Sequence, residues 1–528
     1  MYINIFIYFP CYAETLSEIY EESQREFFTE NIMVLIKKEY SEFGKEYSPA
    51  DFDEELIESV EVINQINPGD DTSGYDLDYW QHMLSLNLKV PSEDNVEKAI
   101  KAAYDNPEVQ VAHKNYRYTL EHEKETVDYG EINASSDVSS VVEIGTNAFG
   151  NNDTIASSST QRIGVTPNDT EFDEQSAILF SKANRAWAFA TGNSNVRVGV
   201  VDTGINNHED LNINSTLSKN FTDKPGLNDV AGHGTRVAGI IGAKTNNSRG
   251  IAGVCWNVTI VNLKVYQLDE DGELESSIFW ITNAINYASQ NSIKLLNMSL
   301  ECANLDSDEI NMLTTAVNGF NGLIICAAGN DANNQTNIQY PSQISSGKLI
   351  SVTSCDNSGE LAADAKYSPV YVDIITQGVG VETTSYPTLY ESRSGTSYAA
   401  PFVTGAAALL LGINPNYTWM QLRTAILGMV DVDDDYSGIV AMSGKLNILQ
   451  SVLISLGYGG VGDVDMNGSI TAADSRLALR ISAQLETATL QEAVMVDVNY
   501  DDLITAADAQ IILNMAAGTA SIVSEELL

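Results

Sequence analysis

The central part of the chain, from about residue 167 to 456, has short continuous apolar runs separated by stretches with helical periodicity. Continuous apolar runs predict strands buried on both faces, and the intervening helices predict that these strands pair in parallel. The expected strands cover residues 196–201, 258–265, 293–298, 323–327 and 349–352, and the expected helices cover 276–288 and 309–317. The pattern therefore predicts an α/β domain with helices on both faces of a parallel sheet.

The preceding part of the chain divides into a folded unit and a linker. Residues 30–120 combine strand-like runs with a helical pattern over 92–104, which predicts an α+β unit. The strand-like runs cover 32–36, 60–63, 84–90 and 109–112. Residues 121–166 are rich in Ser, Asn, Thr and Gly and lack periodicity, so we expect an exposed linker there.

The first residues combine a short apolar run, 2–10, with Cys11-Tyr12-Ala13 and then acidic residues. This pattern is typical of the end of a signal peptide, here residues 1–13, with cleavage after Ala13. No positively charged segment precedes the apolar run, which is consistent with a true start upstream of residue 1. A buried N-terminal strand is the alternative interpretation.

A repeat follows the Gly-rich residues 457–462. The segments 463–474 and 497–508 match at an offset of 34 residues, and each is followed by a helical pattern. Both carry oxygen-bearing residues at the spacing of an EF-hand-type calcium loop, although each ends in Asp rather than Glu. The candidate ligands are Asp463, Asp465, Asn467, Ser469 and Asp474 in the first loop and Asp497, Asn499, Asp501, Leu503 and Asp508 in the second. The second loop has Asp502 at the sharp turn, where glycine is usual.

Composition limits the possible partners. With 72 acidic and 28 basic residues the formal charge is −44, which repels phosphate backbones and argues against nucleic acid as a partner. The same carboxylates suit hard cations such as calcium. The chain has no apolar run of about 18 residues, so no membrane span is expected. A chain of 528 residues predicts about two to four domains.

The five cysteines, at positions 11, 255, 302, 326 and 355, form no CxxC pair. Four of them lie in the central region, either as two disulfides or as four buried thiols, and buried thiols are the preferred interpretation. Without a CxxC or HExxH pattern, no catalytic zinc site is expected.

Two histidines lie in the central region, His208 and His233. His233 stands between two glycines directly before a helical pattern, and these glycines let the backbone turn and a substrate approach closely. His208 lies in a polar sequence that is typical of a turn. His233 is therefore the candidate catalytic base.

Asp202 and Ser397 fit a catalytic role beside this histidine. Asp202 ends an apolar run, and open α/β sheets bind their ligands at the carboxyl ends of strands. Ser397 precedes the apolar helical pattern of residues 402–411, whose N-terminal N–H groups would stabilise a developing anion. A helix-capping role is the alternative for each residue. Because no histidine follows Ser397, the chain order excludes the α/β-hydrolase arrangement.

Three sequence blocks in this order resemble the subtilisin (subtilase) family: Val-Asp-Thr-Gly at 201–204, His-Gly-Thr at 233–235 and Gly-Thr-Ser-Tyr-Ala-Ala-Pro at 395–401. Ala-Ala-Gly-Asn at 327–330 agrees with the same family. The resemblance implies a subtilisin-like domain over 167–456 with Asp202, His233 and Ser397 as its catalytic triad. It also implies an oxyanion hole made by the Asn330 amide and the Ser397 N–H. The implied activity is that of a secreted serine endopeptidase working through an acyl-enzyme.

Within this resemblance, an extended substrate is expected to add a strand beside residues 297–300. The expected binding residues are Ser299, Leu300 and Glu301. The family usually has two glycines where this chain has Glu301 and Cys302. Side chains there narrow the groove or add negative charge, so a preference for basic or small residues beside the scissile bond is a hypothesis.

Calcium binding and regulation are also implied by the resemblance. Residues 245–251 resemble the family's calcium loop, with Asp210 and Asn247 as ligands, and an ordinary Asn-rich turn is the alternative. Residues 30–120 resemble a subtilase prodomain, which assists folding, inhibits the enzyme through its C-terminal strand and is then removed. An unrelated accessory domain is the alternative.

The calcium-loop repeat, residues 460–528, resembles a type I dockerin, the module that attaches enzymes to a cellulosome scaffoldin through cohesin domains. The pairs Ala472-Ala473 and Ala506-Ala507 occupy the partner-contact positions of that family. Their near symmetry is compatible with two binding orientations. A calcium-stabilised cap without a partner is the alternative.

Two other functions stay open at this point. The first is a catalytically silent subtilase fold that serves as a binding module on the scaffold, against which the intact Asp202, His233, Ser397 and Asn330 argue. The second is a ligase-like enzyme that transfers the acyl group to an amine instead of water.

Overall fold

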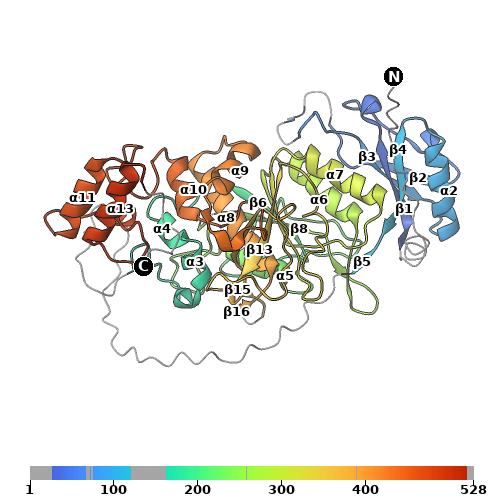
Figure 1. Ribbon diagram of the computed structural model, residues 1–528. Coiled ribbons are helices and arrows are strands. Elements are labelled where there is room, and N and C mark those ends of the chain that lie inside the picture. Colours follow the sequence, from blue (N-terminus) through green and yellow to red (C-terminus); the bar gives the residue numbers. More distant parts are fainter. Residues whose placement is uncertain are drawn as a thin grey trace, which may run out of the picture.

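A computed structural model of the protein describes residues 27–119 and 162–519, except 67–69, 71, 73, 74, 257 and 388. Three units lie in a row: an N-terminal unit, a central α/β body, and a small helical C-terminal module at the opposite end (Figure 1). The predicted signal peptide and residues 121–161 of the predicted linker lie outside the described residues.

The central body is built on a sheet that has nine strands within the described ranges, in the order β17-β18-β14-β13-β12-β11-β6-β8-β7. These strands are β6 (Arg197–Asp202), β7 (Lys219–Asn220), β8 (Thr259–Lys264), β11 (Leu295–Met298), β12 (Leu323–Ala327), β13 (Leu349–Cys355), β14 (Ile374–Gln377), β17 (Asp431–Val432) and β18 (Gly444–Lys445). All neighbours pair in parallel except β17 and β18. The five strands predicted for this sheet are all present, which confirms the α/β prediction.

Alternate residues of each strand point to opposite faces of this sheet. Leu323 and Ile325 of β12 pack into one core, whereas Ile324 and Cys326 pack into another. The first core lies under α3 (Ser176–Phe180), α4 (Ala183–Ala186), α5 (His233–Gly242), α8 (Thr396–Ile413), α9 (Trp419–Leu427) and α10 (Ile448–Ser455). The second lies under α6 (Ile278–Gln290) and α7 (Ser307–Gly319). Helices therefore cover both faces, as predicted.

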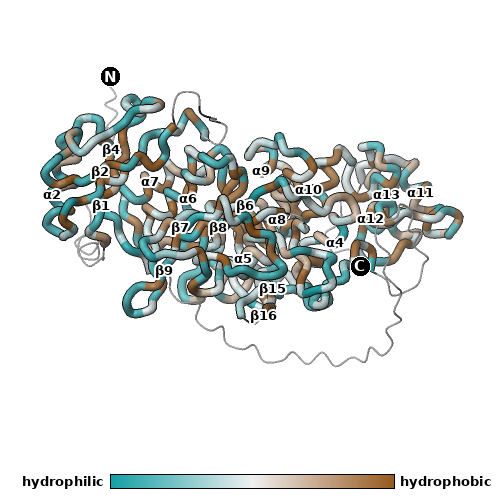
Figure 2. Tube along the Cα trace, turned by 180° about the vertical axis from the view of Figure 1, so that it is seen from behind, coloured by the Kyte–Doolittle hydropathy of each residue, from teal (hydrophilic) through white to brown (hydrophobic). Residues whose placement is uncertain are grey.

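Helix α8 is the central core helix of this body. It is long and apolar enough to cross a membrane, but 83% of it is buried inside the protein. Hydrophobic segments gather in the interior around α8 and β6, while the outer loops are mostly hydrophilic (Figure 2). A hairpin, β15 (Val381–Ser385) and β16 (Leu389–Arg393), packs against α5.

The N-terminal unit is a four-stranded antiparallel sheet in the order β2-β3-β1-β4. Its elements are β1 (Phe27–Ile36), β2 (Ile57–Val62), β3 (Met83–Leu88), α2 (Glu93–Tyr104) and β4 (Val109–Tyr116), close to the predicted ranges. One face packs on α2, and the other packs on α6 and α7 of the central body. A short strand, β5 (Tyr118–Thr119), continues from β4 and pairs with β10 (Leu274–Ser276), which also pairs with β9 (Gln267–Leu268).

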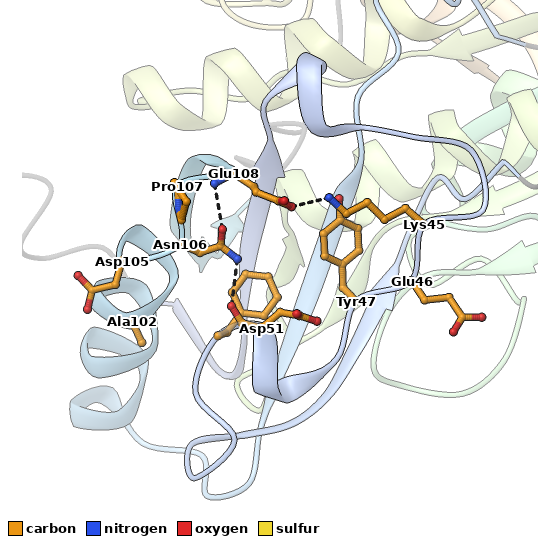
Figure 3. Close-up of a pocket in the computed structure, with 10 residues that line it drawn as sticks. Lys45, Glu46, Tyr47, Asp51, Ala102, Asp105, Asn106, Pro107 and Glu108 are labelled. Carbon is orange, nitrogen blue, oxygen red and sulfur yellow. Dashed lines mark hydrogen bonds and ion pairs between the residues drawn. The ribbon is translucent and has the colours of Figure 1, made fainter.

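A polar hollow lies in the N-terminal unit, between the segment after β1 and the turn that joins α2 to β4 (Figure 3). The Lys45 ammonium lies 2.5 Å from a Glu108 carboxylate oxygen, and the Asn106 amide donates a hydrogen bond to the Asp51 carbonyl at 3.0 Å. These contacts fasten the segment to the turn. The hollow contains none of the predicted site residues.

The C-terminal module consists of α11 (Ala472–Ser482), α12 (Leu490–Val496) and α13 (Ala506–Ala516). Its buried Val464, Val494 and Ile512 belong to the same core as α8 and α10, so the module packs directly on the central body. The two calcium-type loops precede α11 and α13, as the repeat predicts.

Two predictions about loops and thiols have clear outcomes. Residues 162–166 do not belong to an exposed linker, because Ile163 is buried and the Val165 N–H donates to the Asn184 carbonyl at 2.9 Å. The linker prediction is wrong for this end, where apolar side chains pack on the central body. The four described cysteines are buried thiols outside disulfides, which confirms the preferred interpretation for them.

Candidate active site

Asp202 and His233 meet at the carboxyl edge of the sheet. Asp202 ends β6 and is buried, and His233 begins α5. The His233 Nδ1 lies 2.7 Å from Asp202 Oδ1, which also accepts the Thr203 N–H at 2.7 Å. A carboxylate at Nδ1 fixes the ring tautomer and stabilises the imidazolium, which leaves Nε2 as the basic nitrogen.

Two glycines make this close approach of strand and helix possible. A Cβ atom at Gly234 would lie 2.2 Å from the Gly204 carbonyl oxygen and 3.0 Å from the Asp202 Cβ. Gly204 itself has φ 112°, a conformation that favours glycine. Gly234, directly after His233, and Gly204, two residues after Asp202, are therefore required by this packing.

Asp229 holds the segments of Asp202 and His233 together, and the sequence analysis missed it. Its carboxylate accepts hydrogen bonds from the Thr235 N–H at 2.8 Å and the Thr235 hydroxyl at 2.6 Å, in the first turn of α5. It also accepts from the hydroxyl of Thr203, the residue after Asp202, at 2.7 Å. An Asp shortly before a helix was the available sequence signal.

Ser397 lies in the first turn of α8, after Gly395, which has φ 141°. Its hydroxyl lies 3.5 Å from the Ser299 carbonyl, and its own carbonyl accepts the Ser299 hydroxyl at 2.9 Å. The ring of the next residue, Tyr398, has its centroid 5.8 Å from that of His233. Because α5 and α8 also pack together, the structure brings the predicted base and nucleophile to the same end of these helices.

Asn330 follows β12 and lies beside the start of α8. Its Oδ1 accepts the Thr396 N–H at 3.1 Å, while the Gly329 N–H donates to the Thr396 hydroxyl at 3.1 Å. A Cβ atom built on Gly395 would lie 3.4 Å from the Asn330 Nδ2. The oxygen of the amide is thus engaged by backbone, and its NH₂ group is presented next to the Gly395–Ser397 turn.

Glu301 lies under the turn that carries Asn330. It accepts a hydrogen bond from the Asn330 backbone and forms an ion pair with the buried Lys366. The Lys366 N–H in turn donates to the Gly329 carbonyl at 2.9 Å. Burial raises the pKa of Glu301 above its ordinary value, while the Lys366 ammonium opposes this shift. Because this carboxylate is paired with a lysine, it supplies no reason to expect a preference for basic substrates.

Ser299 and Leu300 are buried, so their side chains are not placed to contact an extended substrate. Strand β10 offers a second edge, which β5 of the N-terminal unit covers through pairing at Glu275 and Ser276. His208 has a structural role, as predicted, because its Nε2 lies 2.9 Å from the Leu389 carbonyl.

The predicted calcium ligands Asp210 and Asn247 lie together, with the Asn247 amide donating to Asp210 Oδ1 at 2.6 Å. Asp169, which the sequence analysis missed, accepts the Asn246 N–H at 2.7 Å. Burial raises the pKa of Asp169 to about 6, and the nearby Asp210 carboxylate contributes. Neighbouring carboxylates suit a cation, but Asn247 directs its NH₂ group at Asp210. Calcium at this site stays a prediction.

The first C-terminal loop gathers its predicted acidic ligands. Oxygens of Asp463, Asp465 and Asp474 lie within 4.8 Å of one another, the one acidic group of this kind found in the described part of the chain. Asp463 also accepts the Gly468 N–H at 2.8 Å, which closes the loop. The remaining predicted ligands of this loop, Asn467 and Ser469, are exposed on its rim. Hard oxygen donors at this spacing fit calcium.

The second loop has buried carboxylate oxygens without partners. Asp497 and Asp508 are fully buried, and one oxygen of each lacks a hydrogen-bond partner in the described ranges. Burial raises the pKa of Asp497 to about 6, and the carboxylates of Asp508 and Asp501 contribute. Unpaired buried oxygens fit a cation too, since burial without a partner is costly. The remaining predicted ligands of this loop lie toward the outside: Asn499, Asp501 and Leu503.

The predicted partner-contact alanines are exposed: Ala472, Ala473, Ala506 and Ala507.

A carboxylate-bound histidine and a helix-terminal serine beside an amide fit a serine peptidase site on an α/β sheet. The comparisons agree. The family model described as "Subtilase family" matches residues 193–444. Subtilisin BL of Lederbergia lenta is 34% identical over 230 residues, which are 44% of this chain and 81% of the relative. The chain therefore belongs to the subtilase family, and its central body is a subtilisin-type serine endopeptidase domain.

Two other relatives extend beyond the matched region. The thermostable alkaline protease of Halalkalibacterium halodurans is 34% identical over 251 residues, 48% of this chain and 65% of the relative. Alkaline elastase YaB of a Bacillus strain is 35% identical over 228 residues, 43% of this chain and 57% of the relative. The chain thus spans less than two thirds of the length of these two proteins.

Proposed function

We propose that the protein is a secreted serine endopeptidase that hydrolyses peptide bonds through an acyl-enzyme. The observation that carries this proposal is the 2.7 Å contact between His233 Nδ1 and Asp202 Oδ1 beside the helix-terminal Ser397. The acidic composition is in keeping with a secreted protein, and it gives no support to a nucleic-acid partner.

In the proposed reaction, Nε2 of His233 takes the Ser397 hydroxyl proton as the oxygen attacks the peptide carbonyl carbon. The tetrahedral oxyanion accepts hydrogen bonds from the Asn330 NH₂ group and the Ser397 N–H. The protonated imidazole, stabilised by Asp202, then gives its proton to the leaving amine. Water, deprotonated by the same ring, releases the acyl group and restores the serine.

The N-terminal unit acts in this proposal as an inhibitory prodomain. Its sheet covers α6 and α7, and β5 adds an antiparallel strand to β10 of the catalytic domain. Strand addition by an extended segment is also how a peptide substrate would bind. The maturation site would lie between Thr119 and Pro167.

The C-terminal module acts in this proposal as a type I dockerin that binds a cohesin domain of a scaffoldin and tethers the peptidase to a cellulosome or cell-surface scaffold. Two calcium-type loops at an offset of 34 residues and the exposed alanine pairs support it. Calcium, held by the acidic residues of both loops, would supply the charge that keeps these buried carboxylates in place.

A fluorophosphonate probe tests the peptidase proposal. The processed wild-type protein should be labelled, and the Ser397→Ala variant should not. A folded wild type that neither reacts with the probe nor cleaves casein would instead support the catalytically silent binding module. Product analysis in water separates the ligase-like alternative, because a ligase yields little free acid.

Calorimetry with a type I cohesin tests the tether. Binding should require calcium and should be lost when Ala472 and Ala506 are both replaced by Arg. A calcium-saturated, folded module that binds no cohesin would favour the partner-free cap.

A further inference from the structure

Arg185 of the catalytic domain reaches into the second calcium-type loop of the C-terminal module. Arg185 lies on α4 and is buried. One guanidinium nitrogen donates to Asp497 Oδ2 at 2.8 Å and to Asp502 Oδ1 at 2.7 Å. Charge-assisted hydrogen bonds of this kind are stronger than neutral ones, above all where they are shielded from water.

These contacts of Arg185 use the sharp-turn position of the second loop, where the first loop has glycine instead. In the first loop Gly468 lies there, with φ 92°, and its N–H donates to Asp463. In the second loop the equivalent residue is Asp502, with φ 61°, and its N–H donates to Asp497 at 3.1 Å. Asp502 thus performs the turn at a conformational cost that glycine avoids. Its side chain gains Arg185 and the Ile163 N–H, at 2.9 Å, as partners.

Other contacts surround this bridge. The Lys182 ammonium lies 3.8 Å from the centroid of the Tyr500 ring, and Tyr500 belongs to the second loop. The Gln491 amide donates to the Ala188 carbonyl at 2.7 Å. No residue of the central body forms an ion pair with the first loop, within the described ranges. The module therefore faces the catalytic domain with its second loop.

A cation in this loop and Arg185 would use different oxygens of the same carboxylate. Asp497 Oδ1 is the buried oxygen without a partner, and Oδ2 is the oxygen that Arg185 contacts. The loop can thus hold a cation on its inner side while its outer side stays attached to the catalytic domain. The alanine pairs at the starts of α11 and α13 remain exposed in this arrangement.

We propose that Asp502 and Arg185 dock the second calcium loop onto the catalytic domain, so that the C-terminal module is held in one orientation rather than swinging on residues 457–462. A scaffold partner bound to the exposed alanine pairs would then present the peptidase in a fixed direction. This inference rests on the calcium loops of the proposed function but not on peptidase activity.

Hydrogen–deuterium exchange on the calcium-saturated full chain tests the docking. All proteins carry Ser397→Ala, so that self-digestion plays no part. Asp502→Gly restores the residue of the first loop, and Arg185→Met removes the guanidinium. Each should accelerate exchange of residues 162–166 by about tenfold or more, as expected for the loss of hydrogen bonds to a charged group. Arg480→Met, which removes an exposed arginine paired with Glu486, is the matched control and should leave this segment unchanged.

Calcium titration by calorimetry accompanies each variant. We expect Asp502→Gly to bind as many calcium ions as its parent, because glycine is the usual residue at this turn. The docking is refuted if exchange of residues 162–166 stays at the parent rate in both variants. It is equally refuted if faster exchange comes only with loss of calcium, since Asp502 would then serve the loop itself. Labelling of Ser397 in a separate wild-type sample tests the peptidase function, so the two failures are distinguishable.

Discussion

The ion pair between Glu301 and Lys366 should hold in place the turn that carries Asn330, the proposed oxyanion donor. The variant Glu301→Gln tests this. The Glu301 carboxylate fills the space beside Gly329, where a Cβ atom would lie 2.4 Å from Oε2. It also accepts the hydrogen bond of the Asn330 backbone. Replacement by Gln keeps the volume but leaves the buried Lys366 ammonium without its counter-charge.

The magnitude follows from the burial of the two partners. Removing one partner of a fully buried ion pair costs about 3–5 kcal/mol. About a quarter of the Glu301 side chain is exposed, against 6% for Lys366, so we expect about 2–4 kcal/mol of lost unfolding free energy. A shift of Asn330 should weaken the proposed oxyanion hole, and full loss of one such donor costs about 10²–10³ in kcat, a magnitude established for subtilisin itself. We therefore expect kcat to fall by about 10- to 100-fold with little change in KM.

Chemical denaturation and steady-state kinetics on a peptide substrate measure both effects. Glu486→Gln, which breaks an exposed pair with Arg480, is the matched control and should change stability by less than about 0.5 kcal/mol. The double variant Glu301→Gln with Lys366→Met should recover part of the lost stability, because no unpaired charge remains. The reasoning fails if Glu301→Gln retains both the stability and the kcat of the wild type. Lower stability with unchanged kcat would assign the pair to folding alone.

Three further predictions concern the triad and the N-terminal unit. Gly234→Ala should abolish activity, because its Cβ would lie 2.2 Å from the Gly204 carbonyl, and circular dichroism will show whether the chain still folds. Asp229→Ala should cost about 1–3 kcal/mol and lower kcat without a matching rise in KM, since it removes partly buried hydrogen bonds beside both Asp202 and His233. His113 contacts Asp306 at 2.7 Å, and hydrogen bonding and charge from that carboxylate raise the His113 pKa against the effect of burial. The stabilisation that protonated His113 contributes is therefore complete below its pKa in the unfolded chain, about 6.5, and is lost as the pH rises through its pKa in the folded protein. His113→Gln should thus destabilise the protein more at about pH 6 than at about pH 8 in thermal unfolding.

Each of these has an outcome that would contradict it. An active Gly234→Ala enzyme would mean that the strand and helix separate at no cost. An Asp229→Ala protein with wild-type kcat would show that Thr203 and the start of α5 keep their places unaided. If His113→Gln destabilises the protein equally at both pH values, the charge of the imidazole does not contribute to the stability of the interface.

The sequence predicted the sheet well because its strands are apolar on both faces, and continuous apolar runs leave little ambiguity. It missed β14, Ile374–Gln377, whose Thr376 and Gln377 are buried polar residues in a strand. The candidate catalytic residues could be proposed from the sequence because each lies in a local motif with a glycine within two residues. Asp229 and Lys366 were not, because their roles depend on segments that are distant along the chain.

The arrangement of the three units is compatible with the proposed regulation at one end of the chain and the proposed tethering at the other. The N-terminal unit packs on α6 and α7, on one face of the sheet, and its β5 reaches β10. The C-terminal module shares its core with α8 and α10 and contacts α4, on the other face. Strand β6 lies between these two outer units (Figure 1), and Asp202, which meets His233, is its last residue. Because the attachments use opposite faces, removal of the N-terminal unit should leave the contact between Arg185 and the second calcium loop unchanged.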